Sequence, residues 1–449
     1  MATTQIFMAS TLYGTATLAA ALDADRFGPA DRRILLVSNN AATPETTTPL
    51  DEMPGFERLR GRFDEVRSWN EAISPFHPGG WAPRGDDVVL WERYIRLLWG
   101  LGDDDIELAV ESIQVNPALA LAQIFTGVPV DVYADGLMSY GPTRNKLDPL
   151  VGTRVRRLLH LDLVPGLTPL LLTEFGVEPD VVPTEAFVKV LAELGAQDHE
   201  LPEVDAPALV LGQYLSALSI LTPEEEEELH IRMVRGAAEL GHTQVVFKPH
   251  PTAPARWSRA LEKEARKIGV ELTVLDTPVL AEVLYQRMRP VLVVGCFSTA
   301  LLTATALYGL PAARTGTDLL LERLAPYQNS NRVPVTIVDA LLPELTDRAA
   351  VQAREPGLGT GELTHLLKAV GFAMQPQIYP RLRPEAERYL ARNLTPATWR
   401  YFKRRRLTAL ALPGAVPSQL AFIPRNAAVR RVARRARSVQ RSLKRTALG

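Results

Sequence analysis

The chain alternates short apolar runs with helical stretches along most of its length. In the first half, four apolar runs predict strands: 5–9, 33–38, 107–114 and 128–133. The stretches 16–22 and 119–125 predict helices, 10–15 a glycine-containing loop, and 87–90 fits either a strand or the start of a helix. This β-α-β alternation predicts a parallel, doubly wound α/β sheet.

A second alternation begins near residue 206. Four further apolar runs predict strands, at 208–211, 244–247, 271–275 and 291–294. Helices are predicted from Thr222 and over 254–268, 279–286 and 298–308. Pro223 and the acidic residues after it are typical of a first helical turn. We therefore predict two Rossmann-like domains facing across a cleft, over 1–205 and 206–380, followed by a basic helical tail over 381–449.

Composition narrows the class of protein. The 449 residues are too many for one hydrophobic core, and their 46% apolar and 22% charged content is that of a globular protein. The single cysteine, Cys296, excludes a disulfide framework and fits a reducing compartment. No run approaches 18 apolar residues, so we expect no transmembrane helix and a cytoplasmic protein.

The net charge of −1 hides an uneven distribution. Residues 381–449 contain 18 Lys and Arg but 2 Asp and Glu, a net charge of +16, which leaves −17 for residues 1–380. After the cluster at 403–406, small apolar residues recur at spacings of three and four among arginines over 424–449. This pattern predicts a basic amphipathic helix that docks on the anionic inner face of the cell membrane. A solvated helix, a disordered tail or a segment that holds a polyanionic glycan are the alternatives.

The motif Lys248-Pro249-His250-Pro251 follows a predicted buried strand. The two prolines stiffen the backbone around His250, and ligands of open α/β sheets bind just beyond the carboxyl ends of strands. A rigid histidine beside Lys248 suits a phosphate and a departing oxyanion. Without a ligand, His250 would be an ordinary histidine at a strand end.

Ser298 and Thr299 follow another predicted strand and open an apolar helix. Free backbone N–H groups at such a terminus bind anions, and the two hydroxyls add donors; simple N-capping is the plainer explanation. Between these two sites, Glu282 on a predicted helix is either solvated or accepts hydrogen bonds from ribose hydroxyls. The Gly212-Gln213 pair forms the exit turn of the first strand of the second half.

In the first half, Tyr133-Ala134-Asp135-Gly136 ends a predicted strand. Gly136 permits a tight turn, which would leave the Asp135 carboxylate projecting into a cleft between the halves. Asp-Gly is also a common turn sequence in general. The run Asp103–Asp105 is expected to be a solvated loop or a helix cap, and no Asp-x-Asp metal pair lies at a suitable strand end.

Taken together, these motifs resemble those of bacterial sialyltransferases, most closely the α-2,8-polysialyltransferase-like family. That family carries an acidic-acidic-Gly motif, a His-Pro motif and a later Ser/Thr motif, which here fall on 134–136, 250–251 and 298–299. The turn at Gly212 and Gln213 is similar to the family's entry into its nucleotide-binding domain. One departure is that Ala134 stands at the first acidic position, so Asp135 alone can supply the carboxylate.

The resemblance implies a two-domain GT-B fold, a CMP-sialic acid donor, inversion at the anomeric carbon, and no metal or other cofactor. Asp135 would be the general base, and His250 would stabilise or protonate the departing CMP phosphate. Ser298 and Thr299 would donate to that phosphate. Glu282 would hold the ribose, and Lys248 would add positive charge. The CMP site would consist of Ser298, Thr299, Glu282, Lys248, Pro251, Gly212 and Gln213. Domain closure on the donor would bring this site and the catalytic residues together.

Three alternatives stay open. A CDP-glycerol polymerase also carries a Lys-Pro-His-Pro strand end, although there a histidine activates the acceptor. A CMP-octulosonate or other CMP-nonulosonate transferase would use the same leaving group. A non-catalytic protein that binds polyanions or nucleic acid would explain the basic tail, but the tail lacks interleaved aromatic residues, so we expect no nucleic-acid partner. The acceptor is a glycan or glycolipid, for which His77, Trp81 and Arg144 are candidate cleft residues by position alone.

Overall fold

The computed structural model describes residues 2–196, 201–250, 255–275 and 277–415. The chain divides into two compact units, Met1–Ala386 and Glu387–Gly449, and the larger unit contains both β-sheets. The predicted domain limits at residues 205 and 380 stay predictions.

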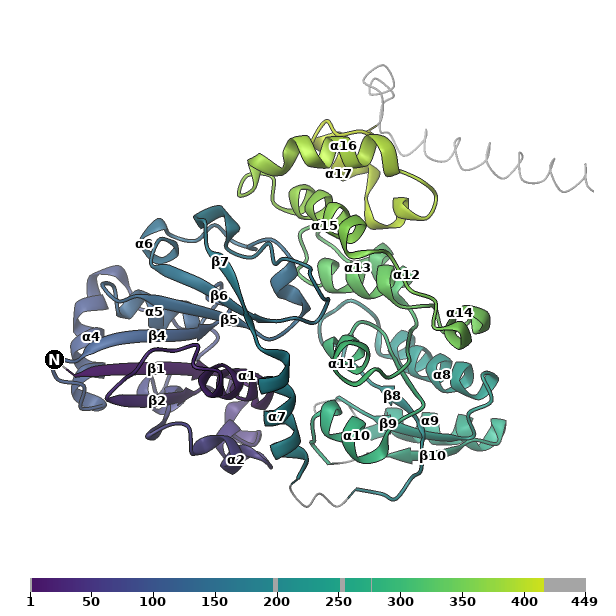
Figure 1. Cartoon of the computed structure of the whole chain (residues 1–449), viewed down its shortest axis with the longest axis horizontal. Coiled ribbons are helices and arrows are strands. Elements are labelled where there is room, and N and C mark those ends of the chain that lie inside the picture. The colour runs from purple at the N-terminus through teal and green to yellow at the C-terminus, as the bar shows by residue number, and fades with distance from the viewer. Residues whose placement is uncertain (1, 197–200, 251–254, 276, 416–449) are drawn as a thin grey trace, which may run out of the picture. The chain divides into compact units, whose positions relative to one another are not determined.

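The first sheet has seven parallel strands in the order β3-β2-β1-β4-β5-β6-β7 (Figure 1). Its strands are β1 (Thr3–Ala9), β2 (Arg32–Val37), β3 (Glu65–Ser68), β4 (Asp105–Glu111), β5 (Val130–Ala134), β6 (Val155–Leu161) and β7 (Glu178–Val182). The chain winds outward from β1 in one direction as far as β3 and then in the other direction from β4. The carboxyl ends of β1 and β4 therefore form a topological switch point, where open α/β sheets bind ligands.

The second sheet repeats this plan with five parallel strands in the order β10-β9-β8-β11-β12. Its strands are β8 (Ala208–Leu211), β9 (Gln244–Lys248), β10 (Glu271–Val274), β11 (Leu292–Gly295) and β12 (Ala312–Arg314). The second switch point lies between β8 and β11. Two parallel, doubly wound sheets confirm the predicted fold class, and their pairing is that of the GT-B fold.

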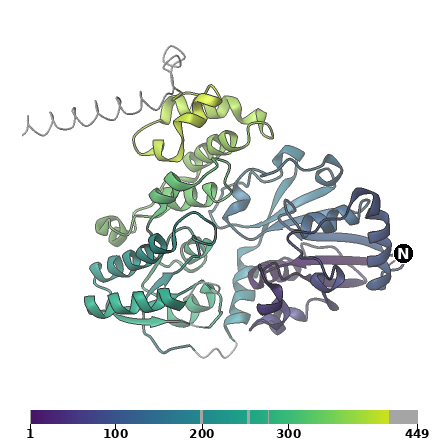
Figure 2. The same cartoon turned by 180° about the vertical axis from the view of Figure 1, so that it is seen from behind.

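The helices of the larger unit lie between the strands in the chain as far as β12, and further helices follow that last strand (Figures 1 and 2). Those of the first half are α1 (Leu12–Asp23), α2 (Phe56–Arg60), α3 (Trp69–Ala72), α4 (Val88–Leu98), α5 (Ala118–Ile124), α6 (Pro149–Gly152) and α7 (Thr184–Gly195). Those that follow are α8 (Pro223–Glu239), α9 (Ala255–Ile268), α10 (Ala281–Met288), α11 (Thr299–Tyr308), α12 (Thr317–Arg323), α13 (Arg332–Leu341), α14 (Arg348–Ala353) and α15 (Thr360–Met374). Helix α7 packs against both α1 and α10, so it connects the two halves by contact as well as by sequence.

The core of the first half forms where β1, β4 and β5 lie side by side. Ile6 of β1 pairs with Leu108 of β4, and both are buried with Val132 of β5 in one apolar cluster. These strands are largely buried on both faces because helices cover the sheet, which explains why they appear in the sequence as mostly apolar runs.

Several element boundaries differ from the predictions. Helix α1 begins at Leu12 because the Thr11 side chain accepts a hydrogen bond from the Gly14 N–H group, so Gly14 lies in a helix and not in a loop. Residues 88–90 start a helix. Strand β4 stops at Glu111 rather than at 114, because Ser112 and Ile113 have φ angles of 55° and 45°. Asp105 begins β4 rather than lying in a loop.

The predicted start of α8 is confirmed in detail. Pro223 is the first helical residue, the Thr222 hydroxyl accepts from the Glu225 N–H group, and the Glu225 carboxylate accepts from the Thr222 N–H group. This capping box satisfies two of the free donors at the helix start.

In the smaller unit, α16 (Arg383–Asn393), which begins in the larger unit, is followed by α17 (Arg404–Ala409). The Arg404 guanidinium lies 5.3 Å from the ring centroid of Trp399, a cation–π contact. The predicted amphipathic helix over 424–449 falls outside the described residues.

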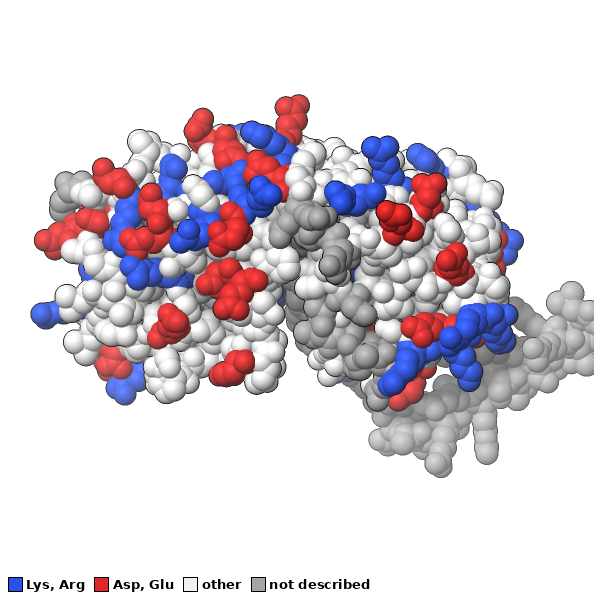
Figure 3. Space-filling model, turned by 90° about the horizontal axis from the view of Figure 1, so that it is seen from below, with Lys and Arg blue, Asp and Glu red and all other residues white. Residues whose placement is uncertain are grey.

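None of the helices within the described ranges is long and apolar enough to cross a membrane. On the face seen from below, Lys and Arg side chains are interspersed with Asp and Glu side chains (Figure 3).

Candidate active site

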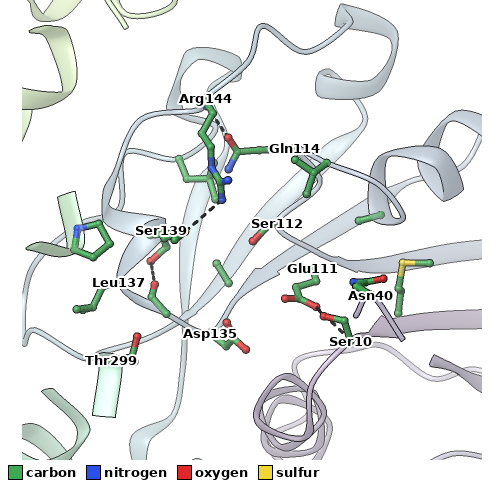
Figure 4. Close-up of a pocket in the computed structure, with 18 of the residues that line it drawn as sticks. Ser10, Asn40, Glu111, Ser112, Gln114, Asp135, Leu137, Ser139, Arg144 and Thr299 are labelled. Atoms are coloured by element: carbon green, nitrogen blue, oxygen red, sulfur yellow. Dashed lines mark hydrogen bonds between the residues drawn. The ribbon is translucent and has the colours of Figure 1, made fainter. Parts of the chain in front are cut away.

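A cavity of about 470 Å³ opens where the carboxyl ends of strands from both sheets meet (Figure 4). Ser10, Glu111 and Asp135, which end β1, β4 and β5 or directly follow them, line one side. Gln213, which follows β8, and Thr299, the first residue of α11 after β11, line the other. Both switch points therefore contribute to the same cavity, whose size suits a small ligand.

Asp135 directly follows β5 and is half-buried against α1. The preceding Tyr133 donates a 2.9 Å hydrogen bond from its hydroxyl to the Met8 carbonyl of β1, which holds this strand end in place. A Cβ atom at Gly14 would lie 3.4 Å from Asp135 Oδ2 and 3.1 Å from the Tyr133 hydroxyl oxygen. Glycine at position 14 therefore lets the first turn of α1 approach the carboxylate closely.

Glu111 is a site residue that the sequence reasoning missed. It ends β4 beside β5, and its carboxylate accepts hydrogen bonds from the Ser10 hydroxyl at 2.6 Å and the Ser10 N–H group at 3.3 Å. The signal that would have found it is an acidic residue at the end of a strand adjacent to β5. The predicted strand ran on to residue 114, which hid this position inside the strand.

The two carboxyl groups are electrostatically coupled. Burial, together with the negative charge of Glu111, raises the pKa of Asp135 to about 7. Burial also raises the pKa of Glu111, against the opposing effect of its hydrogen bonds from Ser10. The cavity therefore contains a carboxyl group that exchanges a proton near neutral pH, as a general base requires.

Gly136 does not form the predicted tight turn, but its missing side chain leaves room at a close contact with the second half. Its φ of −136° is extended backbone that any residue adopts. A Cβ atom at this position would, however, lie 3.3 Å from the Thr299 hydroxyl oxygen of α11. The Asp-Gly segment of the first half therefore comes close to the Ser/Thr segment of the second half.

Ser298 and Thr299 both line the cavity, as the motif suggested. Ser298 is also the N-cap of α11, because its hydroxyl oxygen accepts a 3.3 Å hydrogen bond from the Ala300 N–H group. Capping and ligand contact are compatible here, since the cap uses the oxygen as an acceptor and leaves the hydroxyl proton available.

Gly212 and Gln213 connect the strand ends of the second sheet. The Gly212 N–H group donates to the Lys248 carbonyl at 2.8 Å, and a Cβ atom at Gly212 would lie 2.9 Å from the Phe247 ring. The Gln213 side-chain oxygen accepts a 3.0 Å hydrogen bond from the Phe297 N–H group. Gln213 therefore reaches the cavity and also supports the loop that precedes Ser298.

His250 and Lys248 do not line this cavity. His250 is exposed beyond the end of β9, with its ring centroid 6.1 Å from that of Tyr214. Partial desolvation and the neighbouring Lys248 ammonium lower the pKa of His250, and burial lowers the pKa of Lys248. An uncharged His250 can still donate one ring N–H to a phosphate. Pro251 lies outside the described residues.

Glu282 is neither solvated nor at the cavity wall. It is 2% exposed, and its carboxylate accepts a 2.7 Å hydrogen bond from the Thr303 hydroxyl of α11. Burial raises the pKa of Glu282, and the Lys248 ammonium opposes that effect. Its role as a ribose ligand stays a prediction.

The three acceptor candidates lie in different places. Arg144 lines the cavity with Asp135, whereas His77 lines a separate cavity of about 590 Å³ beside the carboxyl ends of β2 and β3. Trp81 packs on Trp91, with ring centroids 4.6 Å apart. Their acceptor roles stay predictions. Over the described part of the chain, no group of three His, Cys, Asp or Glu residues could hold a metal ion.

The sequence model of the family described as Alpha-2,8-polysialyltransferase matches residues 5–317, which include Asp135, His250 and Thr299. The chain belongs to this family. It is therefore a glycosyltransferase of the polysialyltransferase family, and the predicted resemblance is confirmed. Family membership implies a nucleotide-sugar donor and a glycan acceptor, which argues against a protein that only binds polyanions.

Three solved structures similar to this family member have low identity to it. MurG from Acinetobacter baumannii is 10% identical, with a TM-score of 0.41, over 87% of this chain and 95% of that chain. A UDP-GlcNAc 2-epimerase from Methanocaldococcus jannaschii is 13% identical, with a TM-score of 0.43, over 79% and 91%. The GT-B domain of a sialyltransferase from Photobacterium damselae is 11% identical, with a TM-score of 0.39, over 75% and 96%. No curated protein matches the sequence. These similarities carry no argument about activity.

The raised pKa of Asp135 predicts a stability cost at neutral pH. The folded protein binds a proton at Asp135 that the unfolded chain releases near pH 4, so this group's contribution to the free energy of unfolding falls as pH rises from about 4 to about 7. Asp135→Asn removes the ionisation. Urea unfolding should show the variant more stable than wild type above pH 7, on the order of 4 kcal/mol, with the difference vanishing near pH 4.

Asp103→Asn, at an exposed turn position, is the matched control and should show no such pH-dependent gain. An Asp135→Asn variant whose advantage is the same at pH 4 and pH 8 would contradict the raised pKa.

Proposed function

We propose that this chain transfers sialic acid from CMP-sialic acid to a glycan acceptor, with inversion at the anomeric carbon. The observation that supports this most is the single cavity in which Asp135 of the first half and Thr299 of the second half meet. A transferase needs an acceptor base and a leaving-group site on opposite sides of the reacting carbon. Family membership supports the same activity.

Asp135 is the general base in this scheme. As the acceptor hydroxyl oxygen attacks the anomeric carbon, its proton passes to the Asp135 carboxylate, and the bond between that carbon and the phosphate oxygen breaks. A pKa of about 7 suits this step, because the carboxylate is basic enough to take the proton and is substantially ionised at neutral pH. Attack from the face opposite the leaving phosphate gives inversion.

The leaving CMP is stabilised from the second half. Ser298 and Thr299 donate hydroxyl hydrogen bonds to its phosphate beside the first turn of α11, where free N–H groups also favour an anion. His250 donates or protonates once the donor is bound, since a nearby phosphate raises the pKa of an imidazole. Closure of the two halves on the donor brings His250 to the phosphate.

The other donor-side roles follow from the same scheme. Lys248 adds positive charge, Glu282 holds the ribose, and Gly212, Gln213 and Pro251 shape the nucleotide site. Catalysis needs no metal, because the hydroxyls, the helix start and the basic side chains take the place of a cation at the phosphate. The product contributes to polysaccharide biosynthesis.

The donor class predicts selective stabilisation by CMP. A ligand that binds only the folded state raises its stability, by about 2.7 kcal/mol at a concentration 100 times its Kd. In a thermal-shift screen of CMP, UMP, UDP and GDP, CMP should raise the Tm of the wild-type protein and the others should not. Thr299→Val, which removes one hydroxyl, should weaken the CMP response.

Thr305→Val is the matched control, because Thr305 lies on the same helix and its hydroxyl bonds to carbonyls of α11. It should leave the response to CMP unchanged. Stabilisation by UDP or GDP without CMP would overturn the donor class.

The raised pKa of Asp135 predicts the pH dependence of activity. Because Asp135 must be ionised to act as base, kcat/KM should rise with pH and level off above about 7. Glu111→Gln removes a neighbouring negative charge that raises the pKa of Asp135, so the rise should move to lower pH, on the order of one unit. Asp135→Asn should lower kcat/KM at least about 100-fold at every pH.

The exposed Glu57→Gln variant has the same change in charge and should keep the wild-type profile. A profile unmoved by Glu111→Gln would contradict the coupling of the two carboxyl groups. Full activity in Asp135→Ala would favour the CDP-glycerol type of enzyme, which also releases CMP but activates its acceptor through histidine. A CMP-nonulosonate transferase would instead keep the dependence on Asp135 and prefer another sugar.

The basic segment predicts where the enzyme works. Residues 424–449 contain nine Lys and Arg residues, each worth roughly 1 kcal/mol beside an anionic bilayer. The full chain should bind phosphatidylglycerol vesicles but not phosphatidylcholine vesicles, and deletion of 424–449 should reduce binding at least about tenfold. Unchanged vesicle binding after the deletion would contradict membrane docking by this segment.

A further inference from the structure

Arg144 lies in the wall of the cavity, and none of the carboxylates in the described ranges pairs with it (Figure 4). Its guanidinium has one hydrogen bond among the described residues, to the Met138 sulfur at 3.3 Å, and thioether sulfur is a weak acceptor. No described Asp or Glu pairs with it, and partial burial lowers its pKa. Arginine nevertheless stays charged at neutral pH, so the cavity presents an unneutralised positive group.

The backbone around Arg144 is held from several elements. Its N–H group donates to the Gln114 side-chain oxygen at 2.6 Å, and its carbonyl accepts from the Gln375 side chain. The preceding Thr143 forms 2.9 Å hydrogen bonds from its N–H group and through its hydroxyl with the Tyr379 hydroxyl. The arginine is therefore positioned before any ligand arrives, which reduces the entropy lost on binding.

Two other arginines, the half-buried Arg154 and the fully buried Arg332, show the contacts of an arginine with a structural role. The Arg154 guanidinium donates to four backbone carbonyls, including those of Ala122 and Phe125. Arg332, fully buried, donates to two. The Arg144 guanidinium donates to no backbone carbonyl among the described residues, so its charged group is not used to close a loop or a helix end.

The charged residues that line the cavity indicate what the Arg144 guanidinium would bind. Glu111 and Asp135 are the acidic residues of its lining, and Arg144 is the basic one within the described chain. Sialic acids carry a carboxylate on the anomeric carbon, the atom at which the proposed transfer takes place. Without a cation, two carboxyl groups in the cavity would repel that carboxylate.

We propose that Arg144 binds the carboxylate of a sialic acid in this cavity through a paired guanidinium–carboxylate contact. The inference rests on the proposed function, because it assigns the substrate carboxylate to a residue of the same site. Both the donor sugar and a terminal sialic acid of an acceptor carry this group, and planar carboxylates match the guanidinium fork.

The first test compares Arg144→Met with wild type for binding of CMP and of CMP-sialic acid. CMP has no sugar carboxylate, so its Kd should stay within about twofold. If the donor carboxylate is the ligand, CMP-sialic acid should bind roughly 10- to 100-fold more weakly to the variant. Arg144→Lys keeps the positive charge but lacks the paired N–H donors of a guanidinium. Its Kd for CMP-sialic acid should therefore lie between those of wild type and Arg144→Met. Lys146→Met, the same change at an exposed site two residues away, should match wild type.

The second test separates donor from acceptor. If the acceptor carboxylate is the ligand, Arg144→Met should raise KM for an acceptor that ends in sialic acid by a similar factor. KM for a galactose-terminated acceptor and affinity for the donor should then stay unchanged. Equal losses for CMP, CMP-sialic acid and both acceptors would mean a purely structural role and overturn the inference, as would no loss in any of them.

A measurement on wild-type protein covers the case in which the variants do not fold. Saturation-transfer NMR should detect N-acetylneuraminic acid but not its C1 methyl ester, which lacks the charged carboxylate. Equal signals from both would overturn the inference. Failure of the wild-type protein to bind CMP or to turn over CMP-sialic acid would instead refute the proposed function, so the two failures are distinguishable.

Discussion

The close approach of the Asp135-Gly136 segment to the first turn of α11 is the constraint on which the site depends. A side chain at position 136 would lie 3.3 Å from the Thr299 hydroxyl oxygen, so the two halves meet here almost atom to atom. Each sheet contributes the carboxyl ends of the two strands between which its winding reverses, where backbone polar groups are left unpaired. A cavity that needs the strand ends of both sheets cannot form in either half alone.

The electrostatics of the cavity come from the same arrangement. Strands β4 and β5 are hydrogen-bonded neighbours, so Glu111 and Asp135 stand close together at their ends, and the charge of Glu111 disfavours ionisation of Asp135. A cavity with two such carboxyl groups and one unneutralised Arg144 costs the folded state some stability. Such local costs are typical of sites whose residues are selected for chemistry rather than for packing.

Much of the fold was readable because its central strands are buried on both faces. The runs that became β8 and β11 are apolar throughout, those that became β1 and β5 are mostly apolar, and all four were predicted. Strands β3 and β7 were missed because they lie at the sheet edges and carry exposed polar residues. Strand β6 was missed because Arg156 and Arg157 interrupt its apolar pattern, although both pair with the buried Asp131.

The sequence by itself determined the alternation of strands and helices, and with it the strand ends at which Asp135, His250 and Thr299 stand. It did so because periodicity and turn residues are local properties. Only the tertiary structure decided that Glu111 and Arg144 share a cavity with Asp135, and that Glu282 is buried against Thr303. Those positions depend on which strands become neighbours, on the positive φ angles of Ser112 and Ile113, and on hydrogen bonds between residues more than 200 positions apart. No local pattern encodes such contacts.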